Sequence, residues 1–118
     1  MEMHTREDAR AFMRFCGKLM EIQARFTGLL AEGRPGKPVP EGMLFRDYWT
    51  DSDIAALFRA ACKAAGLSDL DAATIDSIRQ NHGLLQIRQD LLQTCLRRAC
   101  DLLDVPEEGR HQLGLYDN

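Results

Sequence analysis

The strongest limit on the fold of this chain is a segment rich in proline and glycine at residues 33–42. The segment contains three of the four prolines and three of the nine glycines. Because proline fixes φ and has no backbone N–H, these residues can neither continue a helix nor pair as a central strand. We expect an extended, partly polyproline-like crossover here. It separates the first 32 residues from everything that follows.

The stretch before this segment has the pattern of one long helix. Thr5 followed by Asp8 is a helix-start signature, and the pattern continues to Glu32. At 100° per residue its apolar side chains fall within an arc of about 160°. A helix of about 27 residues spans about 40 Å, which is long for one small domain. Because a second chain would cover part of such a helix, we expect a homodimer.

Further helical patterns follow the segment. The run Thr50-Asp51-Ser52-Asp53 offers caps for a helix at residues 53–65, and Ser68 with Asp71 forms a capping pair for a third helix. The strongest apolar pattern runs from Leu84 to Asp104. Asn81-His82-Gly83 either ends the third helix or lies inside one helix from about Asp71 to Asp104, and the sequence leaves both open.

No stretch shows the sustained period-two alternation of paired strands. The 118 residues, 45% hydrophobic and 28% charged, have the composition of one globular domain. We therefore predict an all-α fold, a small helical bundle of three to four helices with a crossover after the first. The single domain covers residues 1–118, with loose termini at 1–4 and 105–118.

Composition also narrows the compartment and the class of ligand. The amino terminus has no apolar stretch behind a basic start, so we expect no secretory signal and a cytoplasmic location. Apolar runs are too short to cross a membrane. A net charge of −3 without a long basic run disfavours nucleic acid as a partner. Helical positions and the lack of a CxxC motif favour buried, reduced thiols at the four cysteines, Cys16, Cys62, Cys95 and Cys100.

Arg88 stands out within the last helical pattern. By helical phase it lies near the middle of the apolar arc, beside Leu84, Leu91 and Leu92. A guanidinium stays charged, so a buried one needs a carboxylate, carbonyl oxygens or a bound anion. Arg88 is therefore a candidate anion or carboxylate site, which would make this a small anionic-ligand binding protein or an enzyme. The alternative is an arginine that lays its stem on leucines and reaches solvent, or pairs within its own chain.

Two surfaces are candidates for binding a partner. Basic side chains recur every four residues on the first helix, opposite its apolar face: Arg6, Arg10, Arg14 and Lys18. This stripe suits a protein partner or, as a second alternative, nucleic acid; a solvated helix face is the competing interpretation. Tyr48 and Trp49 follow the proline-rich segment and are residue types typical of interface hot spots. They serve equally well as aromatic residues that clasp the core.

The sequence contains no motif for nucleophilic catalysis and no phosphate-binding loop, so no catalytic residue, cofactor or metal is predicted. His4 with Glu7, and Glu108 with His111, have Glu-x-x-His-like spacing but lie near the chain ends. A helix-turn-helix at residues 60–79 would present three aspartates to a phosphate backbone. The favoured function is a non-enzymatic, regulatory or interaction module that binds a protein partner through helical surfaces. An enzymatic activity stays undecided.

Overall fold

The structure, a computed structural model, describes residues 3–81 and 89–115. These residues form seven helices. The helices are α1 (Arg6–Gly17), α2 (Leu19–Glu32), α3 (Phe45–Tyr48), α4 (Asp51–Ala64), α5 (Asp69–Asn81), α6 (Gln89–Leu102) and α7 (Glu107–Gln112). The same residues contain no strand, only an isolated bridge between Arg34 and Lys37. The all-α prediction is confirmed, although the helices are shorter and more numerous than the three to four predicted.

Local capping signals lie where the sequence placed them. The Thr5 hydroxyl accepts a hydrogen bond from the backbone N–H of Asp8 at 3.0 Å, and the Thr50 hydroxyl accepts one from Asp53 at 3.1 Å. Both aspartates bond back to the cap backbone, which completes two capping boxes. The second of these helices begins at Asp51, two residues earlier than predicted.

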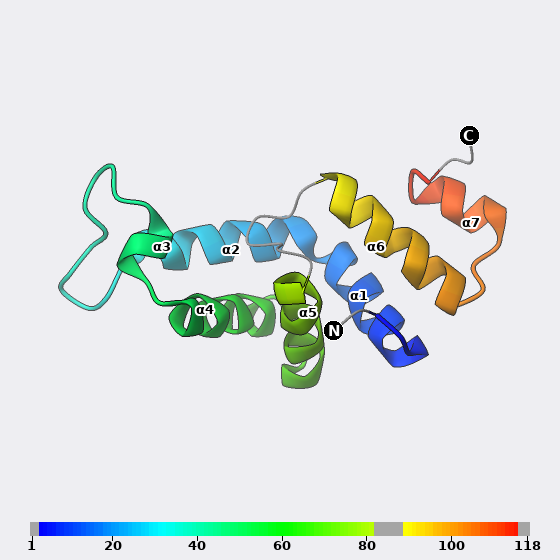
Figure 1. The fold of residues 1–118 in the computed structure, drawn as a ribbon, viewed down its shortest axis with the longest axis horizontal. Coiled ribbons are helices and arrows are strands. Elements are labelled where there is room, and N and C mark those ends of the chain that lie inside the picture. Colours follow the sequence, from blue (N-terminus) through cyan, green and yellow to red (C-terminus); the bar gives the residue numbers. More distant parts are fainter. Residues whose placement is uncertain (1–2, 82–88, 116–118) are drawn as a thin grey trace.

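The prediction of one helix over residues 6–32 is wrong, because the chain bends at Lys18. This residue has φ −114° and ψ 8°, outside the α-helical region, and its N–H donates to the carbonyl of Phe15 at 2.9 Å. Gly17, just before it, has low helix propensity. The bend lets α1 pack against α5 and α6 while α2 packs against α4 (Figure 1). The apolar faces of α1 and α2 are therefore both covered within the chain. The length of the first helical stretch is then no longer a reason to expect a second chain.

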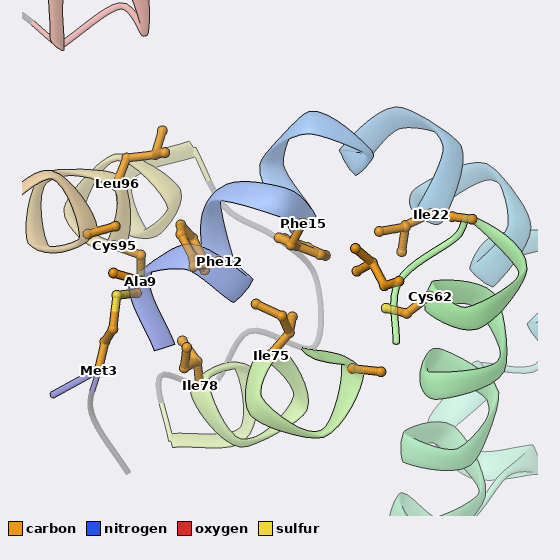
Figure 2. Close-up of a cluster of buried hydrophobic side chains, with 14 of the residues drawn as sticks. Met3, Ala9, Phe12, Phe15, Ile22, Cys62, Ile75, Ile78, Cys95 and Leu96 are labelled. Atoms are coloured by element: carbon orange, nitrogen blue, oxygen red, sulfur yellow. The ribbon is translucent and has the colours of Figure 1, made fainter. Parts of the chain in front are cut away.

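Two apolar clusters form the interior. In the larger one, Phe12 of α1 lies between α5 and α6, and Phe15 lies farther along α1, close to Ile75 of α5 (Figure 2). Ile75 and Ile78 of α5 face them from one side. The smaller cluster joins the ends of α2 and α4 around buried Leu30, Trp49 and Ile54.

The molecule is elongated, with extents of 50 × 28 × 23 Å and a radius of gyration of 15.4 Å. A compact domain of this length would have a radius of gyration of about 13.5 Å. Residues 33–44 form an irregular loop that projects from one end, between α2 and α3 (Figure 1). Near the other end, residues 107–112, expected in a loose terminus, form α7, and Leu115 is buried. Met3 is buried as well. None of the described helices is long and apolar enough to span a bilayer.

Candidate functional site

The basic residues proposed as a partner surface on the first helix have unequal surroundings. The Arg6 guanidinium donates to the carbonyl of Leu102 at 2.9 Å and pairs with Asp104 at 3.2 Å. These contacts fasten the start of α1 to the end of α6. Arg10 is exposed, and Lys18 is exposed at the bend.

Arg14 forms an ion pair with Asp71 that joins α1 to the first turn of α5. Its Nε donates to one carboxylate oxygen at 3.0 Å, and its Nη2 donates to the other. The Asp71 side chain is 12% exposed. Hydrogen bonds from Arg14, together with those from Ser68, lower the pKa of Asp71 below its ordinary value of 3.8. Arg14 thus has a structural role within the chain.

Tyr48 and Trp49 anchor the proline-rich loop. The Trp49 indole N–H donates to the carbonyl of Leu30 at 3.1 Å, and its ring is buried. The Tyr48 hydroxyl accepts from the backbone N–H of Arg34 at 2.9 Å and donates to the carbonyl of Lys37. The Arg34 guanidinium carbon lies 5.1 Å from the centroid of each of these aromatic rings. The polar atoms of both aromatic residues are therefore engaged within the chain.

Several other residues singled out from the sequence remain to be located in the structure. Arg88, the proposed anion or carboxylate site, lies outside the described residues, as do His82 and Gly83 of the possible helix break; Asn81 is the last residue of α5. His111 lies 3.6 Å from Glu107. Residues 3–81 and 89–115 contain no group of three or more acidic, histidine or cysteine side chains placed to hold a metal ion.

All four cysteines are free; Cys62, Cys95 and Cys100 are buried as predicted, whereas Cys16 is half-buried. Burial raises the pKa of Cys16 to about 12 and that of Cys62 to about 11. Because the thiolate is the reactive form, these side chains are poor nucleophiles at neutral pH. They act as small apolar residues of the core.

The outer face of α2 is an exposed surface that sequence reasoning did not single out. At 100° per residue the buried side chains of α2 occupy one arc, and the charged side chains Glu21, Arg25 and Glu32 occupy one edge. The remaining arc of about 140° is exposed and carries no charge. We call it the α2 outer face; its residues are Met20, Gln23, Ala24, Thr27, Gly28 and Ala31.

Two residues of the α2 outer face are unusual for a solvated helix. The methionine Met20 is 81% exposed. Gly28 lies in the helix interior, where glycine is about 1 kcal/mol less favourable than alanine. Its φ is not in the left-handed region, and a Cβ built there meets no atom within 4 Å. Nothing among the described residues therefore requires a glycine at this position.

A buried charge cluster lies between α4 and α5. Asp76 is 1% exposed and Arg79 is 5% exposed. One oxygen of Asp76 accepts from Arg79 at 2.7 Å, and the other accepts from Arg59 at 3.0 Å. The Arg79 guanidinium carbon lies 4.8 Å from the centroid of the Phe58 ring.

Sequence reasoning considered this stretch only as part of a possible helix-turn-helix and did not single out Arg79. The signal that drew attention to Arg88 is also present here, because Ile75 and Ile78 place Arg79 on the apolar side of its helix. Applying the same phase argument to residues 69–81 would have found it. The α2 outer face has no comparable signal, since its exposure depends on which side of α2 meets α4.

Comparison of this chain with protein-family models, with curated proteins and with solved structures gives no match.

Proposed function

We propose that this protein is a non-enzymatic interaction module that binds through the α2 outer face, and that the partner this face fits is a second copy of the chain. The observation that supports the proposal is the uncharged, exposed arc of α2 around Met20 and Gly28. A homodimer formed in this way would be the scaffold on which any regulatory role is exercised.

The chemistry of the face favours a copy of itself. In a two-fold symmetric dimer the same patch meets itself, so any charge near the axis faces a like charge. The α2 outer face avoids that repulsion because its six residues are uncharged. Ala24 and Gly28, one turn apart, present little side-chain bulk and allow two helix backbones to approach closely. Met20 supplies a flexible apolar side chain to fill the contact.

The alternative of nucleic-acid binding through the basic face of α1 has weaker support. Arg6 and Arg14 both pair with acidic residues of the same chain. Only part of the basic stripe is then available to phosphates. The other alternative, an anionic ligand at Arg88, concerns a residue outside the described part of the chain.

The oligomeric state of the purified chain tests the proposal. Sedimentation equilibrium over a range of protein concentrations should give a mass approaching twice the chain mass of 13.3 kDa. Ala24→Arg places a charge on the face that meets itself, and it should shift the equilibrium to monomer while the helical circular dichroism is unchanged.

The matched control is Ala60→Arg, the same substitution at an exposed position of α4. This variant should dimerise like the wild type. A wild-type mass that stays monomeric at high micromolar concentration would contradict the proposal. So would equal behaviour of the two arginine variants, since a dimer formed elsewhere would not distinguish them.

A further inference from the structure

A small cavity lies beside the buried arginine of α5. Its volume is about 10 Å³, and apolar side chains from four helices make up most of its lining. The phenylalanines Phe12, Phe15 and Phe58 contribute rings, and Leu92 closes it from α6. Among the described lining residues, Arg79 is the one polar side chain.

The donors of Arg79 exceed the acceptors that the described residues provide. Its Nη2 donates to Asp76, but Nε and Nη1 are buried and have no hydrogen-bond partner there. Asp76 bonds only to Nη2 of this guanidinium, and its second oxygen accepts from Arg59 at 3.0 Å and Gln80 at 3.4 Å. The guanidinium carbon lies 4.8 Å from the centroid of the Phe58 ring. Buried donors of a charged group that lack an acceptor are costly.

The charge balance of the cluster is also incomplete. Arg59 and Arg79 supply two positive charges and Asp76 supplies one negative charge. Arg59 reaches solvent, with 53% of its side chain exposed, whereas Arg79 does not, at 5%. The single carboxylate of Asp76 is shared between the two arginines, so the cluster as a whole carries one excess positive charge.

A cavity of this size holds about one water-sized species. A buried water forms hydrogen bonds to two to four polar groups, as donor and as acceptor. Here the described lining offers donors from a single residue and nothing to accept the hydrogens of a water. An anion needs only donors, and it supplies the missing negative charge.

We infer that the cavity beside Arg79 is a binding site for a single compact monovalent anion of about the size of chloride. Arg79 donates to the anion from nitrogens that Asp76 leaves free. The rings of Phe12, Phe15 and Phe58 exclude water from it, which strengthens the electrostatic attraction. The site is separate from the α2 outer face and does not depend on dimerisation.

Chloride is the probe that tests this site. The unfolding equilibrium of the full chain in urea is measured at constant ionic strength while sodium chloride replaces sodium gluconate. Gluconate is too large an anion for the cavity. Because chloride binds the folded state, each tenfold rise in chloride above its dissociation constant should lower the unfolding equilibrium constant about tenfold. Arg79→Met, which keeps Asp76 paired with Arg59, should unfold identically in the two salts.

Arg10→Met provides the control, since it removes an exposed arginine and should retain the full chloride response. Wild-type unfolding that is the same in chloride and gluconate would overturn the inference, as would a response that survives in Arg79→Met. If Arg79→Met does not fold, wild-type crystals grown in sodium bromide decide the matter. An anomalous peak within hydrogen-bond distance of the Arg79 guanidinium supports the site, and its absence refutes it.

Discussion

Phe58 is the side chain whose replacement tests the packing of the core most directly. It is 2% exposed on α4 and touches groups from three other helices. Its ring centroid lies 6.1 Å from that of Phe15 in α1 and 5.5 Å from that of Phe26 in α2. The Arg79 guanidinium of α5 lies over the same ring at 4.8 Å.

The expected loss for Phe58→Leu follows from these contacts. An apolar exchange of similar volume ordinarily costs less than about 1.5 kcal/mol. Each aromatic pair contributes about 0.5–1.5 kcal/mol beyond its buried area. A desolvated cation–π contact adds about 2 kcal/mol. Because the substitution removes two ring pairs and one cation contact together, the free energy of unfolding should fall by about 3–5 kcal/mol.

The assay is urea unfolding at 25 °C, followed both by fluorescence of Trp49 and by far-ultraviolet circular dichroism. Trp49 is the only tryptophan, so its signal is unambiguous. Phe45→Leu is the control, because Phe45 is half-buried in the smaller cluster. A loss of less than about 1.5 kcal/mol for Phe58→Leu, equal to that of the control, would refute the assignment of extra stability to the ring contacts.

Two further predictions concern single side chains or backbone positions. The lowered pKa of Asp71 stabilises the folded state at pH values above its ordinary pKa, and this stability is lost as the pH falls through the folded-state pKa. Asp71→Asn should therefore flatten the dependence of the free energy of unfolding on pH, measured by urea unfolding between about pH 5 and pH 2. An unchanged slope would show that the pair with Arg14 contributes nothing to stability. Gly33 has φ 75° and ψ −166°, and a Cβ there would lie 2.5 Å from the carbonyl oxygen of Lys37. Gly33→Ala should cost about 1–3 kcal/mol in thermal or urea unfolding, more than Gly36→Ala, where φ is 72° but the space is open; equal losses would contradict the clash.

The parts of the fold that depend on neighbouring residues in the sequence could be predicted. Thr5 and Thr50 cap helices because a threonine and an aspartate three residues apart satisfy each other's backbone N–H groups. Gly33 ends α2, as its lack of a side chain allows. These signals need no knowledge of the rest of the molecule.

The parts that depend on tertiary packing could not be predicted. The bend at Lys18 arises where the first helical stretch must face two different sets of neighbours, and its residues continue a helical apolar pattern on both sides. Arg6 and Arg14 look like a solvated stripe until Asp104 and Asp71 are brought beside them from 98 and 57 residues away. The proposed partner surface is the α2 outer face and not the basic stripe for the same reason, because contacts between residues distant in sequence determine which side chains are exposed.

The position of Phe26 between the two apolar clusters has a consequence for local unfolding. It is the half-buried aromatic side chain that, among the described residues, packs against both apolar clusters. Because the smaller cluster occupies one end of an elongated molecule, the end that carries α3 and Trp49 can open as a unit of its own while α1, α5 and α6 keep their packing. Amide hydrogens near Trp49 should then exchange through a partial opening of lower free energy than those around Phe12, and Phe26→Ala should widen the difference between the two groups.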